Sequence, residues 1–390
     1  MEIIPKIERI AKNVTFVHLP LMFSYKLFSL YFPLYLLERN FTLAQVGYTN
    51  FLIYLPIALF APIAGYLNHR INPAILASLG VLGYGLYSLG MILFPNMIVF
   101  YLLQIMLGIS AALFFVSSRA IMMGSDLKNP DKAFAFFYSV PSYADALAPA
   151  LGAFFIWKFG FAGVFIASVI IAIITSIYCF FSLRKDSKKL TENIEVEKSV
   201  ENYKEVFKSI KTKGAIPLIL TSLAVLIVGG FNNTFFVLFL KSLNWTQDQI
   251  LIFNSLLSLA FLPVSWLVVR MIKKKSVTNI CYGSEIVGFF SFMLGAISGM
   301  LNFYLAFLIM LGKNIGGLIT GSGRSGLLTT KLKKYPEESA AVDTIFSPLS
   351  TALGALIGGL IIGPIGYPLI FMLSGILIFG SGLLSRKIIK

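Results

Sequence analysis

Charged residues are scarce in this chain of 390 residues, and histidine and cysteine are scarcer still. Only 13% of the residues are Asp, Glu, Lys or Arg, whereas an ordinary soluble domain is roughly 25% charged. A soluble fold is excluded, because its water-facing surface would have to be built largely from apolar side chains. A lipid bilayer is the solvent that accepts such a surface.

The two cysteines and two histidines limit the chemistry that the chain can carry. Cys179 and Cys281 both fall in apolar stretches, where we expect small buried thiols and neither a disulfide nor a metal site. His18 and His69 lie far apart, and there is no Asp-rich or His-rich cluster and no phosphate-binding Walker loop. We therefore expect no enzyme, no cofactor and no metal ion, and any active transport must draw its energy from a gradient.

Long apolar runs occupy most of the chain. A helix needs about 20 apolar residues to cross a bilayer, and an open sheet edge cannot lie in lipid. The predicted spans are 13–37, 43–67, 74–94, 97–123, 133–157, 160–183, 214–240, 247–270, 277–299, 302–329, 338–362 and 366–385. The predicted fold class is an all-α membrane protein of twelve transmembrane helices.

The distribution of Lys and Arg predicts the orientation. With a cytoplasmic N-terminus, the cytoplasmic segments hold 25 of the 32 Lys and Arg residues, and the external loops hold three, which are Arg39, Lys158 and Lys241. The excess of Lys and Arg in the cytoplasmic segments remains when the long segment 184–213 is left out of the count. By the positive-inside rule we expect both termini in the cytoplasm and the protein in the plasma (inner) membrane. The net charge of +15 then faces the inner leaflet, and no nucleic-acid partner is needed to explain it.

The segment 184–213 is the one long polar stretch, and it mixes charges of both signs. Four of its residues recur at helical spacing: Val200, Tyr203, Phe207 and Ile210. This spacing predicts an amphipathic helix that lies on the membrane surface. The segment would divide the chain into an N-terminal six-helix bundle at 1–183 and a C-terminal one at 214–390.

The two halves carry similar short motifs in the same order. The segment 40–46 (NFTLAQV) matches 244–250 (NWTQDQI) at an offset of 204. Further matches follow at offsets of 204 to 206: Leu107-Gly108 with Leu311-Gly312, Ser118-Arg119 with Gly323-Arg324, and Pro130, Gly152, Gly160 and Phe165 with Pro336, Gly358, Gly366 and Phe371. They predict a duplication, and parallel halves place a solute site near mid-membrane at their interface.

Twelve spans, a repeated six-helix half and a central polar linker resemble the major facilitator superfamily over essentially the whole chain. The sharper signal is Gly65-Tyr66-Leu67-Asn68-His69-Arg70, which resembles the G-x-L-x-D-R motif that follows the second span in that family. The resemblance implies that Gly65 and Arg70 belong to a gate in which the Arg pairs with an acid at the end of the fourth span, here Asp126. His69 departs from the motif, because the family has Asp at this place.

Two weaker matches to the family concern solute contact and direction. Gln104 stands where many relatives have Arg in an R-x-x-x-G pattern of the fourth span, which implies a contact with the solute. The segment 148–152 (APALG) resembles part of a G-P-x-x-G pattern common in exporters of the family.

Charged residues within the spans are expensive, at roughly 2.5–3.5 kcal/mol each at a helix centre, and they mark functional sites unless a partner explains them. The spans hold Lys26, Arg119, Asp145, Glu285, Lys313, Arg324 and Asp343. Arg119, Arg324 and Asp343 fall a turn or two from a cytoplasmic end, where we expect pairing, as between Arg324 and Asp343, and a structural or gating role ahead of solute contact. Glu285 is expected to pair with a nearby basic group.

Lys26 and Asp145 lie deeper in the membrane. Each is about 13 residues from the cytoplasmic start of its span, which is roughly 20 Å at 1.5 Å per residue. Spans 1 and 5 are neighbours in the family that the chain resembles, so we expect a Lys26–Asp145 ion pair. It is either a permanent bridge or a site that opens, with Lys26 binding the solute and Asp145 carrying the proton.

The remaining candidate solute ligands are polar residues that either line a cavity or join helices: Asn232, Asn233, Asn254 and Lys313. Lys313 is the third charge at mid-depth. Gly317, Thr320 and Arg324 follow it on one predicted face of span 10, which suits either close helix packing or a bendable gate.

Secondary transport by alternating access is the leading interpretation, with the lipid bilayer, a small solute and a proton or another ion as partners. Lys26 and Lys313 against Asp145 leave about one positive charge at mid-depth, which favours an organic anion. The exporter-like segment and the 14% aromatic content favour instead proton-driven efflux of amphipathic compounds. A membrane-embedded enzyme or a channel is the remote alternative, and a monomer is the family default.

Overall fold

The protein is described here by a computed structural model of residues 7–29, 31–40, 43–94, 96–187, 195–212 and 215–388, which are almost entirely helical. The first half contains α1 (Arg9–Ser29), α2 (Phe32–Glu38), α3 (Leu43–Arg70), α4 (Pro73–Leu93), α5 (Met97–Met123) and α6 (Pro130–Ser187). A separate helix, α7 (Val196–Thr212), follows. The second half contains α8 (Ile216–Ser242), α9 (Gln247–Met271), α10 (Ser276–Ala296), the 3-10 turn η2 (Ser298–Met300), α11 (Phe303–Lys331), α12 (Pro336–Ile365) and α13 (Tyr367–Ile388).

Local sequence explains where several of these helices begin. The side chains of Asn72, Asn96 and Asn302 accept hydrogen bonds from the first turns of α4, α5 and α11. Thr246 and Gln249 form a reciprocal capping box at the start of α9. Each cap satisfies backbone N–H groups that have no partner within their own helix.

The predicted repeat is visible in the backbone. Asn40 and Asn244, which are matched at an offset of 204, both have a φ of 63°. Gly160 and Gly366, which are matched at an offset of 206, have φ values of 68° and 78°. Only Gly, and to a smaller extent Asn, adopts this left-handed region readily. The duplicated motifs therefore make the same sharp turns in both halves.

Nine helices among the described residues are long and apolar enough to cross a membrane, or ten if the bent pair formed by 196–211 and 216–232 counts as one span. One of the nine covers 130–185 and contains the break at Gly160, so its two arms correspond to two predicted spans. The predicted span 13–37 is divided into α1 and α2. This pattern is consistent with twelve crossings.

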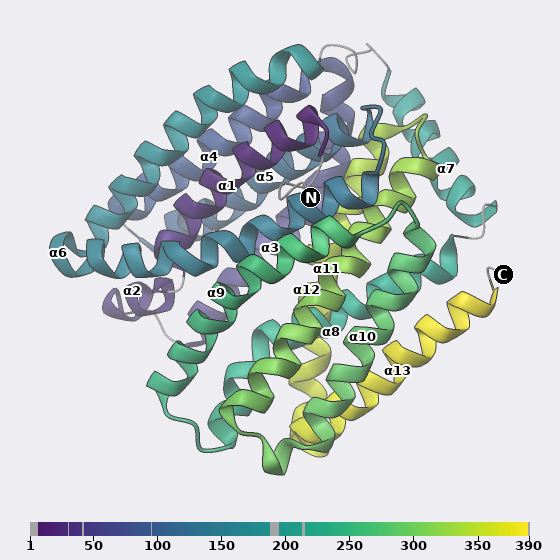
Figure 1. The fold of residues 1–390 in the computed structure, drawn as a ribbon. Coiled ribbons are helices and arrows are strands. Elements are labelled where there is room, and N and C mark those ends of the chain that lie inside the picture. The colour runs from purple at the N-terminus through teal and green to yellow at the C-terminus, as the bar shows by residue number, and fades with distance from the viewer. Residues whose placement is uncertain are drawn as a thin grey trace.

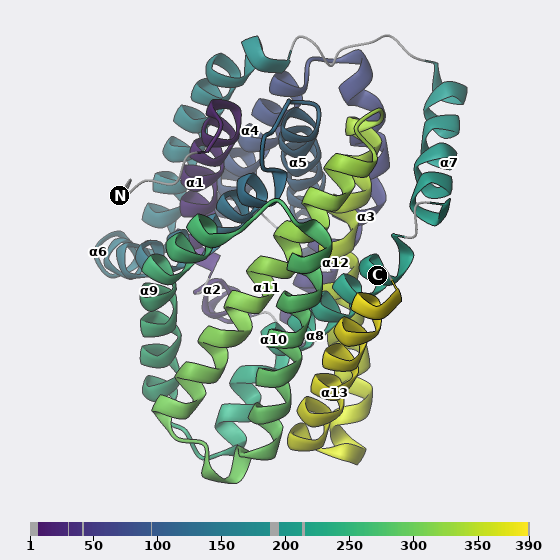
Figure 2. The ribbon, with the colours of Figure 1, turned by 45° about the vertical axis from the view of Figure 1, so that its right-hand side comes forward.

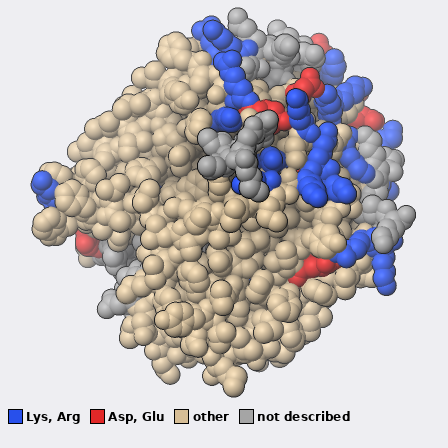
Figure 3. Space-filling view, viewed as in Figure 1, with Lys and Arg blue, Asp and Glu red and all other residues tan. Residues whose placement is uncertain are grey.

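The outer surface is that of an integral membrane protein. Large apolar side chains stand exposed along the helices, among them Leu93, Ile98, Phe181 and Leu360. In Figure 3, Lys and Arg side chains gather at the upper right, over the end where α7 lies, and most of this face carries no charge. We call the end of the molecule that carries α7 the linker end.

The two halves meet at the linker end. Figure 1 shows the first half running in from the left and the second half from below, so that they approach each other toward α7. The contacts between the halves join α3 and α5 to α12, and α6 to α9 and α11. The largest apolar cluster includes Phe114 and Phe134 of the first half and Leu327 and Ala341 of the second. An apolar core therefore runs across the interface.

The helix α7 is present as predicted, but its apolar stripe is divided. Tyr203 and Ile210 pack against the apolar core between the halves, whereas Val200 and Phe207 are exposed. Figure 2 shows α7 beside α3 and α12, outside the two halves. The spacing of apolar residues predicted the helix correctly, but Val206, which the stripe omitted, is the residue that is fully buried.

Close packing of α8 on α12 depends on two glycines. A Cβ on Gly230 would lie 2.5 Å from Thr351 Cα, and a Cβ on Gly354 would collide with the Ile227 carbonyl oxygen. Small residues allow this approach of two backbones, which is the usual basis of helix association in lipid.

Replacement of Gly230 by Ala should push these helices apart and destabilise the protein by about 1–3 kcal/mol. The adjacent Gly229 is the matched control, because a Cβ there meets nothing within 4 Å. Gly229→Ala should be neutral, or stabilising by up to about 1 kcal/mol through helix propensity. Thermal unfolding in detergent measures both variants, and equal melting temperatures would refute the proposed packing.

Candidate functional site

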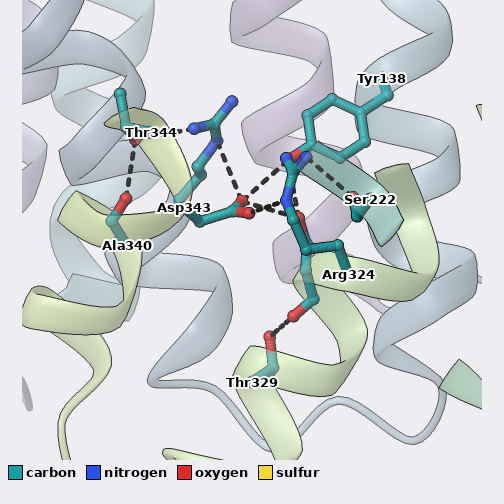
Figure 4. A network of polar contacts seen from close by, with 9 residues as sticks. Tyr138, Ser222, Arg324, Thr329, Ala340, Asp343 and Thr344 are labelled. Carbon is teal, nitrogen blue, oxygen red and sulfur yellow. Dashed lines mark hydrogen bonds and ion pairs between the residues drawn. The ribbon is translucent and has the colours of Figure 1, made fainter. Parts of the chain in front are cut away.

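A buried carboxylate, Asp343, lies where four helices from both halves meet (Figure 4). It projects from the second turn of α12 toward α11 and toward two residues of the first half, Arg119 on α5 and Tyr138 on α6. Arg324 and Ser325 of α11 complete its surroundings. We call these five residues the Asp343 cluster.

Both oxygens of the Asp343 carboxylate are engaged. Arg324 Nε donates to Oδ1 at 2.8 Å, and Ser325 Oγ and Tyr138 Oη donate to Oδ2 at 2.7 and 2.9 Å. Arg119 Nε stands 3.7 Å from Oδ2, which is an ion pair without a hydrogen bond, and Arg119 Nη1 donates to Thr344 Oγ1 at 2.7 Å. The predicted Arg324–Asp343 pairing is confirmed.

Burial makes these interactions strong. The side chains of Arg119, Arg324 and Asp343 are 7%, 3% and 0% exposed. Breaking a buried ion pair by removal of one partner costs about 3–5 kcal/mol, because the other charge is left without compensation. Two guanidinium groups face one carboxylate, so the cluster keeps one positive charge in excess.

Other polar contacts between the halves gather at the same end. Asp131 at the start of α6 accepts from Ser276 Oγ and Asn279 Nδ2 of α10 at 2.7 and 2.5 Å. Asn129 Nδ2 donates to the Ile272 carbonyl at 3.3 Å, and His69 Nε2 lies 2.9 Å from Glu338 Oε1. The linker end is therefore closed by polar contacts around an apolar core.

The residues of the predicted gating motif lie at this closed end. Asp126 forms an exposed ion pair with Lys333 at 2.6 Å, and the Arg70 guanidinium lies 5.2 Å from the centre of the Tyr66 ring. A Cβ on Gly65 would lie 2.5 Å from Tyr203 Oη and 3.1 Å from the Ala341 side chain. Glycine at 65 therefore permits the close approach of α3 to α7 and α12, and a gating role for Gly65, Arg70 and Asp126 stays a prediction.

The predicted Lys26–Asp145 ion pair is confirmed, with Lys26 Nζ 2.8 Å from Asp145 Oδ1. The two side chains are 26% and 35% exposed, unlike those of the Asp343 cluster. Close contact of α1 with α6 positions the pair, because a Cβ on Gly152 would collide with the carbonyl oxygen of Leu27. Gly152, in the exporter-like segment, thus has a structural role in placing Lys26.

Asp145 and Tyr138 are seven residues apart on α6, a spacing that places both on one face of a regular helix. Asp145 follows Tyr138 by two helical turns, and Tyr138 contacts Asp343 and Ser325 across the interface. Two turns correspond to roughly 10 Å along the helix axis. The ion pair therefore lies on the face of α6 that carries Tyr138, farther from the linker end than the Asp343 cluster.

Lys313 is placed differently from the other charges. Its side chain is buried in the second half, with Nζ 5.2 Å from the centre of the Phe371 ring of α13 and without a hydrogen-bond partner among the described residues. The predicted stripe on α11 is divided, because Thr320 packs against Gly283 of α10, whereas a Cβ on Gly317 would meet nothing within 4 Å. A contact of Lys313 with solute stays a prediction.

The uncharged candidates are spread over both halves. Gln104 is fully buried, accepts a hydrogen bond from Tyr87 Oη at 3.2 Å and donates to the Phe100 carbonyl, so it joins α4 to α5. Asn232 on α8 is buried, and Asn254 on α9 is half-buried. The side chain of Asn233 lies outside the described residues. Solute binding by these four residues stays a prediction.

Glu285 has the basic partner that was predicted, because Arg386 Nη2 of α13 donates to its Oε2 at 2.7 Å. Sequence reasoning missed Ser325 and Thr344, which bind the charged groups of the cluster. Ser325 follows Arg324 and Thr344 follows Asp343 directly in the sequence. Hydroxyl groups next to intramembrane charges are the signal that would have found them.

The sequence matches the family model described as Major Facilitator Superfamily over residues 14–347. No curated protein matches the sequence.

Solved structures with low sequence identity share the fold. The chain is similar to the human organic anion transporter MFSD10 (TETRAN), with a TM-score of 0.77, 13% identity and coverage of 97% of this chain and 99% of that one. It is similar to a bacterial homologue of the iron transporter ferroportin in an outward-facing state, with a TM-score of 0.74, 12% identity and coverage of 97% and 99%. The proton:xylose symporter XylE gives a TM-score of 0.72, 14% identity and coverage of 97% and 96%.

Asp343→Asn should destabilise the protein strongly, because two buried guanidinium groups would lose their shared anion. The expected loss is about 3–5 kcal/mol, seen as a lower melting temperature in detergent. Glu285→Gln is the control, since its partner Arg386 is 35% exposed and can turn to water. A loss for Asp343→Asn no greater than that for Glu285→Gln would contradict the account of the cluster.

Proposed function

The chain belongs to the Major Facilitator Superfamily of secondary transporters, and from that premise we propose that it carries small organic anions together with protons by alternating access. The observation that carries the proposal is the partly exposed Lys26–Asp145 ion pair on the helix α6, whose Tyr138 contacts the second half, behind a closed linker end. A partly exposed ion pair is easier for a solute to open than a fully buried one.

The charges of the Asp343 cluster and of the Lys26–Asp145 pair, which lie apart from the carboxylates of Asp131, Glu337 and Glu338, support an anion as the solute. Lys26, Arg119 and Arg324 carry three positive charges, and Asp145 and Asp343 carry two negative ones. One positive charge is left in excess on a surface between apolar helices, and such a surface attracts anions. One similar structure is that of an organic anion transporter and another that of a proton symporter, which supports the same class of solute and coupling ion.

The ion pair supplies a mechanism for coupling. An anionic group of the solute binds the Lys26 ammonium in place of the Asp145 carboxylate. Asp145, without its counter-ion in a poorly hydrated site, then binds a proton, so that solute and proton are held together. Loss of the solute allows Lys26 to pair with Asp145 again, and the proton leaves.

The Asp343 cluster supplies the gate in this proposal. Arg324 and Ser325 belong to the same half as Asp343, so their bonds to it survive when the halves separate at the linker end. Arg119 and Tyr138 belong to the other half, and their contacts with Asp343 are the ones that break. The buried carboxylate thus keeps a cation in both states, and the freed Arg119 offers the anion a second binding group.

The orientation predicted from Lys and Arg places the linker end in the cytoplasm. The state described here is then the one closed toward the cytoplasm. We propose this orientation, in the plasma membrane, for the transport cycle.

Removal of Lys26 alone should harm transport more than removal of both members of the pair. Lys26→Ala leaves an uncompensated carboxylate, whereas Lys26→Ala with Asp145→Ala leaves no charge, and we expect the single variant to be about tenfold slower than the double. Counterflow of radiolabelled organic anions in proteoliposomes measures this, with the exposed Lys241→Ala as the control. Equal losses in the single and double variants would reject the electrostatic pairing.

Asp145→Asn should abolish the response of transport to a pH gradient, because an amide keeps the shape of the side chain but does not bind a proton near neutral pH. Anion binding should be retained. Anion binding is followed by thermal shift, and transport by uptake with and without a pH gradient. Proton-driven uptake in the Asn variant would move coupling to another residue. Stabilisation by amphipathic cations, and not by anions, would favour the efflux function instead.

A further inference from the structure

Three potential metal ligands from the two halves converge at the linker end. His69, the penultimate residue of α3, lies with Nε2 2.9 Å from Glu338 Oε1 and 4.0 Å from Glu337 Oε2, both in the first turn of α12. One ligand atom from each residue lies within 4.8 Å of the others. The three side chains are buried, with exposed fractions of 9%, 4% and 0% for His69, Glu337 and Glu338. We call them the His69 cluster.

A second observation indicates that a cation belongs in this cluster. Glu338 Oε1 accepts from His69 and from Asn202 Nδ2 of α7 at 2.8 Å, but its Oε2 is buried without a hydrogen-bond partner among the described residues. A buried carboxylate oxygen without a partner is costly. A divalent cation would give this oxygen of Glu338 a partner.

The spacing of the ligand atoms fits a transition metal. Zinc binds imidazole nitrogen and carboxylate oxygen at about 2.0–2.2 Å, so neighbouring tetrahedral ligands lie roughly 3.3–3.5 Å apart. The two measured separations from His69 Nε2, 2.9 and 4.0 Å, lie on either side of this value. One imidazole with two carboxylates suits Zn²⁺, Fe²⁺ or Mn²⁺, whereas Mg²⁺ prefers oxygen ligands and keeps much of its water.

We propose that His69, Glu337 and Glu338 form a site for a divalent transition metal that ties α3 to α12 and holds the linker end closed. The metal is a regulator and not the cargo, because the cluster lies at the sealed end, whereas the half-exposed ion pair is Lys26–Asp145. Bound metal adds a bridge that must break before the halves separate. Metal therefore slows transport.

The helix α7 belongs to the same assembly. Asn202 binds Glu338, and Tyr203 Oη donates to the Pro62 carbonyl of α3 at 3.1 Å. The linker helix thus covers the cluster and contacts both halves beside it.

Zinc binding to the purified full-length protein tests the proposal without knowledge of the solute. About 100 µM Zn²⁺ should raise the melting temperature by several degrees, with about one zinc bound per chain by elemental analysis, while Mg²⁺ should have little effect. His69→Gln and Glu338→Gln should each abolish the shift. Glu285→Gln is the matched control, because it removes a carboxylate that pairs with Arg386 away from the cluster.

A rescue variant separates metal binding from a structural role. His69→Cys should restore the Zn²⁺ response, because a thiolate is a good zinc ligand, although it cannot replace the hydrogen bonds of imidazole. A wild-type protein without a Zn²⁺ shift would overturn the proposal, as would an equal shift in wild type and both Gln variants. A His69→Gln effect on the pH dependence of stability, without any metal response, would overturn it in favour of a proton-operated latch.

Discussion

The structure depends on the pairing of one buried carboxylate, Asp343, with two buried guanidinium groups. In lipid an unpaired charge is costly, so every conformation must leave Asp343 with a cation. Arg324, in the same half, provides one that does not move away, and Arg119 of the other half adds a second in the state described here. In the proposed gate, the Arg119 contact forms only when the linker end is closed, whereas the Arg324 contact is kept in both states.

The proposed gate, the Asp343 cluster, and the proposed solute-binding pair, Lys26 and Asp145, lie at different depths along α6. The Asp343 cluster is buried, whereas Lys26 and Asp145 are partly exposed on the face of α6 that carries Tyr138, about two turns farther from the linker end. Water and solute compete poorly for the charges of a buried cluster and more easily for those of a partly exposed pair. In the proposed cycle the same chemistry, an acid next to a base, closes the linker end at one depth and exchanges solute at the other.

Sequence reasoning predicted the features that helical period and hydropathy determine, and it failed where a distant helix decides. Hydropathy and charge predicted the spans and a basic partner for Glu285, and depth together with the family resemblance, which makes spans 1 and 5 neighbours, predicted the Lys26–Asp145 pair. The predicted apolar stripe of α7 is divided, with Tyr203 and Ile210 packed against the core and Val200 and Phe207 exposed, because the surface that covers α7 comes from α3 and α12. His69 was identified only as a departure from the family motif. Its partners lie on α12, and no local sequence pattern indicates a contact between residues so far apart in the chain.

Distances across the two ends of the molecule, measured by pulsed electron paramagnetic resonance, test the central claim most directly. Cys179 and Cys281 are replaced first, and spin labels are then placed at the exposed Lys128 and Lys274 of the linker end, and in a second protein at Lys158 and Lys241 of the opposite end. The account predicts that Asp343→Asn lengthens the linker-end distance and shortens the opposite one. Unchanged distances, or distances that lengthen together, would contradict the claim that Asp343 holds the linker end closed.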